Sequence, residues 1–252
     1  MKISIITAVR NCKDTIRDTI RSVVRQKHSD IEHIVIDGAS TDGTREILQD
    51  QSDRFTHFVS EPDNGLYDAL NKGIELSSGE LIGHLNGDDI YQDEMVVSNV
   101  VEAINDSEAD TAYGDLVYVD RQDTAKVRRY WKSSRMRFDY FPMGWMPPHP
   151  TFFVKKKIYE TYGGFNTDLR ISADYELMLR FLYKHRIPAV YVDRVLIKMR
   201  EGGMSNASLK NRLEANREDR LAWTINDLKP NWYTRYLKPL SKLGQFIRRK
   251  KL

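Results

Sequence analysis

Apolar positions along the first 85 residues alternate between short continuous runs and a helical spacing. The runs predict buried strands at 2–7, 31–36, 55–59 and 81–85. The helical spacing between them predicts helices at 16–24, 40–48 and 67–76. A crossover between parallel strands needs roughly a dozen residues, so this alternation predicts an α/β fold with a mostly parallel sheet covered by helices on both faces.

The pattern changes near Asp110, where short segments rich in aromatic residues replace the alternation. These segments predict strands at 111–115, 116–119, 127–131 and 151–154. Further helices are expected at 174–185, 206–227 and 236–251. Because no repeat or low-complexity linker interrupts it, we expect one domain over 1–205, with halves at 1–109 and 110–205, and a C-terminal helical extension at 206–252.

Composition narrows the class of protein. A chain of 252 residues with 40% hydrophobic residues can bury an ordinary core. The sequence shows no signal peptide and no apolar stretch of membrane-spanning length, and its single cysteine, Cys12, excludes an internal disulfide. These features predict a cytoplasmic protein.

The net charge of +3 hides an uneven distribution. Eight of the 39 basic residues follow Asp227, whereas all 36 acidic residues precede or include it. The main domain therefore carries no basic stripe, which argues against a nucleic-acid partner. In the tail, residues 236–252 combine an apolar helical face with basic residues elsewhere. This pattern favours peripheral contact with an anionic membrane surface; a solvated terminus or a helix packed on the domain is the alternative.

Polar residues cluster where the predicted parallel strands end, at 7–11, 37–38, 60–63 and 86–89. Ligands of open α/β sheets bind beyond these carboxyl ends. Residues 38–44 nearly fit a phosphate-binding loop, but Thr44 and Arg45 replace its Lys and Ser or Thr, and no G-x-G-x-x-G occurs. A carboxylate such as Asp37 can instead accept hydrogen bonds from a ribose or a base, unless it only caps the next helix with Ser40.

The segment NGDD, residues 86–89, places two adjacent carboxylates at a strand end. Neighbouring carboxylates repel each other and are stabilised by a cation, hydrogen-bond donors or water. Mg²⁺ and Mn²⁺ prefer such oxygen ligands together with phosphate oxygens. The sequence is therefore compatible with a divalent metal site or with a solvated acidic turn.

Five segments occur in an order that resembles glycosyltransferase family 2, and more narrowly its bacterial capsule and exopolysaccharide branch. They are IITAVRN (5–11), VIDGASTDGT (35–44), SEPDNGLYDALNKG (60–73), NGDD (86–89) and SADYEL (172–177). The resemblance implies a GT-A fold with a Rossmann-like central sheet, a nucleotide-sugar donor that is usually UDP-linked, and Mg²⁺ or Mn²⁺. It also implies inversion at the anomeric carbon and transfer to a hydroxyl of a lipid-linked or growing surface glycan. The donor would bind the 1–109 half and the acceptor the 110–205 half.

The resemblance also assigns roles to single residues. The donor would contact Thr7, Val9, Arg10, Asp37, Asp63, Asn71, Lys72, Asn86, Gly87 and Asp88. Asp88 would be the principal metal ligand, with Asp89 and His149 as further candidates. Asn86 replaces the first acid of the family's D-x-D motif, so the protein contributes less charge to the metal than the motif normally does.

Asp174 stands where the family has its catalytic base, although Ala173 replaces the acid that normally precedes it. An inverting transfer needs a carboxylate that takes the proton of the acceptor hydroxyl; a simple helix cap is the alternative, and Glu176 is a weaker candidate. In the acceptor half, Trp145 is a candidate for stacking on a sugar and Arg200 for a segment that closes over the diphosphate. His149, in a proline-rich loop, is equally compatible with a structural role.

Two other classes remain open. A sugar-1-phosphate nucleotidyltransferase shares the architecture and the need for metal, but it normally has a glycine-rich basic loop after the first strand, where this chain has AVRN, residues 8–11. A catalytically weak nucleotide-sugar-binding protein is the second alternative, favoured by Asn86 and Ala173.

Overall fold

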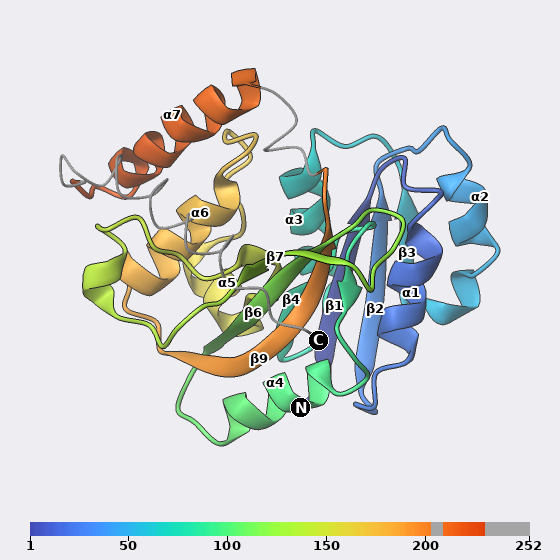
Figure 1. Ribbon diagram of the computed structural model, residues 1–252, viewed down its shortest axis with the longest axis horizontal. Helices are drawn as coiled ribbons and strands as arrows, with labels where there is room; N and C mark the ends of the chain where they lie inside the picture. Colours follow the sequence, from blue (N-terminus) through green and yellow to red (C-terminus); the bar gives the residue numbers. More distant parts are fainter. Residues whose placement is uncertain (203–208, 230–252) are drawn as a thin grey trace.

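The computed structural model describes residues 1–202 and 209–229, and its centre is a nine-stranded mixed sheet (Figure 1). The strands are β1 (Ile3–Val9), β2 (Ile31–Asp37), β3 (His57–Ser60), β4 (Leu81–His84), β5 (Ile90–Tyr91), β6 (Thr111–Val119), β7 (Val127–Trp131), β8 (Phe153–Lys155) and β9 (Ala189–Arg200). The α-helices are α1 (Ile16–Val24), α2 (Thr44–Gln49), α3 (Leu66–Leu76), α4 (Val96–Asn105), α5 (Lys156–Tyr162), α6 (Ala173–Met178) and α7 (Leu209–Ile225). The α/β fold class is confirmed, whereas the predicted tail helix at 236–251 lies outside the described residues.

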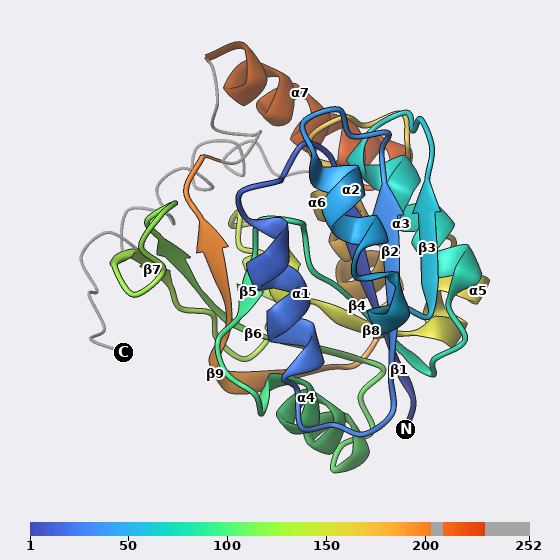
Figure 2. The same ribbon diagram turned by 90° about the vertical axis from the view of Figure 1, so that its right-hand side faces the viewer.

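The first half contains the predicted parallel sheet, in the order β3-β2-β1-β4. Its central strands β1 and β4 are buried along their whole length, because helices cover both faces. Right-handed crossovers place α1 and α2 on one face, and the reversal from β3 to β4 places α3 on the other (Figure 2). Helix α3 lies directly on β1: a Cβ atom on Gly73 would stand 2.3 Å from Cγ2 of Ile6.

The second half extends the same sheet in the order β8-β6-β9-β5, and β7 forms a hairpin with β6. Here the structure corrects several predictions. The two short segments expected at 111–119 form the single strand β6. Strand β9 and helix α4 were not expected, and the helix predicted at 174–185 is the short α6 followed by a π-helical segment, η4 (Leu179–Lys184).

The C-terminal helix α7 lies within the helix predicted at 206–227 and packs against α6 (Figure 1). Its contact includes the buried residues Ala222 and Trp223. In the described part of the chain, no helix has both the length and the apolar character needed to cross a membrane.

Candidate active site

The end of β1 and the NGDD segment lie against each other. The N–H of Gly87 donates to the carbonyl of Ala8 at 3.1 Å, and a Cβ on Gly87 would stand 2.6 Å from Cγ2 of Val9. Only glycine therefore allows this approach. Val9 is buried under Gly87, and the Thr7 hydroxyl lies in the core, 3.0 Å from Nε2 of His33, while Arg10 is exposed.

Asp37 and Asp63 lie together at the ends of β2 and β3. The Asp37 carboxylate is fully buried and accepts hydrogen bonds from the hydroxyls of Ser40 and Ser60, the latter at 2.7 Å. A Cβ on Gly38 would lie 2.2 Å from Oδ2 of Asp63, so the two loops are in close contact. Asp37 accepts hydrogen bonds from the backbone N–H and the hydroxyl of Ser40 and so closes the turn between them. It does not cap α2, which begins only at Thr44.

Asn71 and Lys72, both predicted to contact the donor, are held by protein groups. The Asn71 amide exchanges two hydrogen bonds with the backbone of Phe165, at 2.9 and 2.8 Å. Lys72 Nζ donates to Glu61 at 2.7 Å, and this hydrogen bond raises the pKa of Lys72. Asn71 therefore fastens the loop that leads to α6, a function that its position in a donor motif does not indicate.

The carboxylates of the NGDD segment are poorly compensated. Asp89 is 1% exposed, Nδ2 of Asn86 donates to its Oδ2 over 3.4 Å, and the carboxylate also has a backbone hydrogen bond from Arg200. Oδ1 of Asp89 and Oδ1 of Asn86 are buried without a hydrogen-bond partner. Burial, together with the charge of Asp88, raises the pKa of Asp89 well above its ordinary value. Burial also raises the pKa of Asp88, against the opposing charges of Arg121 and Arg200.

This donor set fits a hard divalent cation. Unpartnered carboxylate and amide oxygens are the ligands that Mg²⁺ and Mn²⁺ take, and a cation would compensate the two adjacent carboxylates. Within 1–202 and 209–229, no three His, Cys, Asp or Glu side chains form a metal-binding group. A cation at Asp88 and Asp89 would therefore keep several positions for water or phosphate oxygens.

Asp174, in contrast, is well supplied with donors. Its Oδ2 lies 3.0 Å from Nδ1 of His149, and its Oδ1 accepts a hydrogen bond of 3.3 Å from the hydroxyl of Tyr67. The Asp174 side chain is 15% exposed and that of His149 28%, so the pair is accessible from one side. The structure thus brings His149 to the predicted base. The alternative in which Asp174 only caps its helix does not account for these two contacts.

Tyr118, which is partly buried on β6, responds to both carboxylate groups. Burial raises the pKa of Tyr118, Arg129 opposes the shift, and the carboxylates of both Asp89 and Asp174 add to it. The buried His84, which ends β4, responds to Asp174 alone: burial and His149 lower its pKa to about 4, and Asp174 opposes the shift.

Three other candidates are structural. Arg200 ends β9, is 3% exposed, and donates to the carbonyls of Asp88 and Arg121, at 2.9 and 3.0 Å, and to the Asp18 carboxylate at 2.7 Å. The expectation that it sits in an exposed closing segment is wrong, because strand β9 extends to it. Glu176 is buried and paired with Arg180 at 2.9 Å.

Trp145 is half-buried and makes edge-on contacts with other aromatic rings, those of Tyr113, Tyr140 and Phe141. These contacts favour packing over an open stacking platform. Sequence reasoning did not single out His84, Tyr67, Tyr118 or Arg121. In the sequence, only their position could have pointed to these residues: His84, Tyr118 and Arg121 lie near strand ends, and Tyr67 lies within the 60–73 motif.

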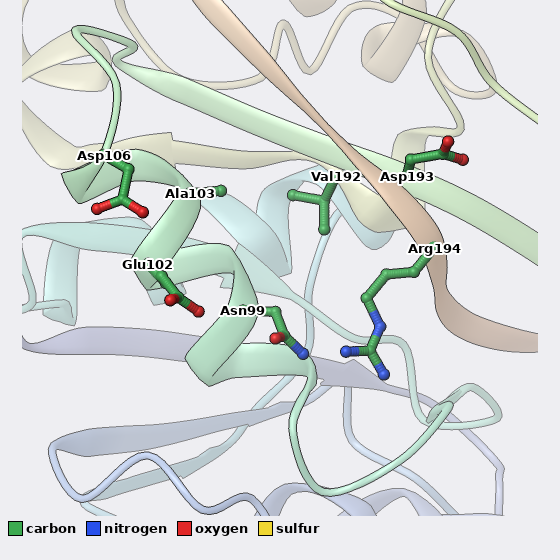
Figure 3. Close-up of a pocket in the computed structure, with 7 residues that line it drawn as sticks. All are labelled: Asn99, Glu102, Ala103, Asp106, Val192, Asp193 and Arg194. Carbon is green, nitrogen blue, oxygen red and sulfur yellow. The ribbon is translucent and has the colours of Figure 1, made fainter.

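A hollow of about 280 Å³ lies away from these residues, between α4 and β9 (Figure 3). Its lining includes Glu102 and Asp106 from α4 and Arg194 from β9. The Arg194 guanidinium pairs with Asp93 at 2.5 Å. None of the predicted site residues lines this hollow, so the strand-end site remains the candidate active site.

Comparison with known proteins identifies the family of this chain. The model of the family described as "Glycosyl transferase family 2" matches residues 4–163. An uncharacterized glycosyltransferase of Mycobacterium tuberculosis is 34% identical over 71% of this chain and 68% of its own length. A PGL/p-HBAD biosynthesis glycosyltransferase of Mycobacterium bovis is 26% identical over 81% of this chain and 78% of its own.

Solved structures show the same fold. A fragment of S. aureus TarS in complex with UDP-GlcNAc has a TM-score of 0.70 and 17% identity, covering 91% of this chain and 68% of that one. The mannosyltransferase PcManGT from Pyrobaculum calidifontis, in complex with GDP-Man and Mn²⁺, has a TM-score of 0.65 and 18% identity, covering 96% and 69%. By its family match, its relatives and its fold, the chain belongs to glycosyltransferase family 2.

Proposed function

We propose that the protein is an inverting glycosyltransferase that moves a sugar from a nucleotide sugar, UDP-linked, to a hydroxyl of a lipid-linked or growing surface glycan. The observation that carries the proposal is the geometry of the Asp174 carboxylate, whose Oδ2 lies 3.0 Å from Nδ1 of His149 and whose Oδ1 accepts a hydrogen bond from the Tyr67 hydroxyl. Similar folds bound to UDP-GlcNAc and to GDP-Man with Mn²⁺ support a nucleotide-sugar donor.

In this proposal Asp174 takes the proton of the acceptor hydroxyl while the hydroxyl oxygen attacks the anomeric carbon. The bond between that carbon and the diphosphate oxygen breaks, and the nucleoside diphosphate leaves with the bonding electrons. A single displacement of this kind inverts the anomeric configuration. His149 and Tyr67 hold the two carboxylate oxygens, so the base keeps one orientation during the step.

On the donor side, Asp63 would provide an acceptor for the nucleoside, while the fully buried Asp37 holds the adjoining turn through Ser40 and Ser60. Gly87 lets the NGDD segment lie close against Val9. Asp88, with Asp89 and Asn86, would hold Mg²⁺ or Mn²⁺, which supplies positive charge to the departing diphosphate. Arg121, whose charge acts on Asp88, is exposed beside this group and adds a second positive charge.

The cellular role belongs to the same proposal. We place the enzyme in capsule or exopolysaccharide synthesis, in the cytoplasm, with residues 236–252 against the inner face of the membrane. A basic amphipathic tail suits an enzyme whose acceptor is anchored in a lipid surface.

Calorimetric titration of UDP and GDP, with and without Mn²⁺, tests the donor side. We expect UDP binding that strengthens with Mn²⁺, and we expect the Mn²⁺ effect to disappear in Asp88→Ala, because the principal ligand is gone. Asp106→Ala, an exposed aspartate beside the α4–β9 hollow, is the matched control. A UDP affinity that changes neither with Mn²⁺ nor in Asp88→Ala would contradict the metal site. Release of pyrophosphate during turnover would show a nucleotidyltransferase instead.

A further inference from the structure

The segment just before Asp174 is fastened to a helix far along the chain. The backbone N–H groups of Arg170, Ile171 and Ser172 donate hydrogen bonds of 2.9, 2.8 and 2.8 Å to the carboxylate of Glu218. Glu218 belongs to α7 and is 4% exposed. Hydrogen bonds to an ionised group are stronger than neutral ones, so three of them on a buried carboxylate form a firm anchor.

Two further contacts, from α7 and from the residue directly after it, reach α6, which lies below α7 in Figure 1. Nε1 of Trp223 donates to the hydroxyl of Tyr175 at 2.9 Å, and Nδ2 of Asn226 donates to Oε1 of Glu176 at 2.9 Å. Tyr175 and Glu176 directly follow Asp174 in the chain. Helix α7 therefore holds residues on both sides of the proposed base.

Helix α3 holds the same segment from its other end. The Tyr67 hydroxyl donates to the carbonyl of Ile171 at 2.7 Å, and Asn71 binds both backbone groups of Phe165. The peptide of Ile171 is thus bound through its N–H to α7 and through its carbonyl to α3. Hydrogen bonds to both helices therefore hold loop 165–172, and α6 begins directly after it at Ala173.

We propose that Glu218 is a positioning residue for Asp174, and that α7 is a working part of the catalytic unit although it lies beyond the family match at 4–163. The inference rests on the proposed role of Asp174 as the base. Misplacing a reacting group by about 1 Å can cost roughly 100-fold in rate, so the anchor acts on the rate of transfer more than on donor binding.

The change Glu218→Gln tests this. A neutral amide accepts through one oxygen only, and its NH₂ group faces the three N–H donors. We expect faster hydrogen exchange of amides 170–172. We also expect kcat for nucleoside diphosphate release in water to fall by about 10- to 100-fold. The donor used is whichever of UDP-glucose, UDP-galactose, UDP-GlcNAc and GDP-mannose the unaltered protein hydrolyses fastest. The KM for that donor should stay within about twofold of its value in the unaltered protein. Glu214→Gln, on the same helix and 42% exposed, is the control.

The double variant Glu218→Gln/Asp174→Asn separates positioning from general loss of structure. If Glu218 acts through Asp174, adding Glu218→Gln to Asp174→Asn should not lower the residual rate of Asp174→Asn any further. Unchanged exchange, unchanged kcat, or an equal loss in both backgrounds would overturn the proposal. If Glu218→Gln does not fold, Glu218→Asp keeps the charge and must show the same selective fall in kcat. Full activity of Asp174→Asn alone would instead overturn the base assignment, on which this inference depends.

Discussion

The two carboxylate groups of the site differ in how the protein compensates them. Oδ2 of Asp174 lies 3.0 Å from Nδ1 of His149, and its Oδ1 accepts a hydrogen bond from the hydroxyl of Tyr67. Asp89 has an oxygen without a partner and a pKa well above its ordinary value, because it is buried beside Asp88. The protein itself thus supplies partners for Asp174, whereas the NGDD segment leaves a buried carboxylate oxygen without one. Under the proposed function, this difference separates a base that needs a fixed orientation from a group of oxygens that would hold a cation.

The largest effect that tests this comparison is expected for Asp174→Asn. An amide keeps the shape of the side chain but cannot take the acceptor proton, so turnover should fall by roughly 10³-fold. UDP affinity with Mn²⁺, measured by calorimetry, should stay nearly unchanged. Asp168→Asn, at an exposed position of the preceding loop, is the control. A variant at Asp174 that keeps most of its rate is not compatible with a base at this position.

A smaller loss is expected for His149→Gln. This change removes the imidazole that holds Oδ2 of Asp174, while the contact of Tyr67 with Oδ1 remains. We expect kcat to fall by about tenfold with little change in the KM of the donor. Steady-state kinetics measures both, with His57→Gln on the exposed end of β3 as control. Loss of Mn²⁺ affinity in His149→Gln, with kcat unchanged, would move His149 to the metal side.

The smallest effect concerns the stability of the metal-free protein. Because the pKa of Asp89 is higher in the folded chain than in the unfolded chain, ionisation favours unfolding. This penalty is absent below the ordinary carboxylate pKa and grows as the pH rises toward the raised value. Asp89→Asn removes it, so we expect a gain of about 2 to 4 °C in Tm at pH 7.5 in EDTA, or roughly 1 kcal/mol.

The same substitution should give no gain at about pH 3 or below, under the ordinary carboxylate pKa, where most Asp89 side chains carry a proton in both states. Differential scanning fluorimetry across this pH range measures the difference, with Asp106→Asn as control. A gain that does not depend on pH would show that burial of charge is not the cause.

The sequence predicted the strands that carry short runs of apolar residues. β1 and β4 are buried along their whole length and β2 beyond its first residue, although β2 also contains Glu32, His33 and Asp37. β9 was missed because Asp193 and Arg194 interrupt its apolar pattern; both side chains face outward and form ion pairs. Helix α4 carries a helical spacing at Val96, Val100 and Ile104, so its period was sufficient to find it, whereas the two-residue β5 offers no signal.

The site was predictable in its residue types and less so in its contacts. The SADYEL segment drew attention to Asp174 as the proposed base, but the pairing of Asp174 with His149 joins segments 25 residues apart, and no local pattern encodes it. Asn71 shows the limit most clearly. Its motif suggests the donor, and its amide in fact binds Phe165, because the fold brings that loop over α3.

The absence of a side chain at Gly73 sets how closely α3 packs on β1. It lets α3 rest on Ile6 without any side chain between them, and α3 in turn carries Tyr67 and Asn71, which hold the loop leading to the base. The distance between α3 and β1 therefore sets the position of the loop that precedes Asp174. A single methyl group at Gly73 would push α3 away from the sheet and displace that loop with it.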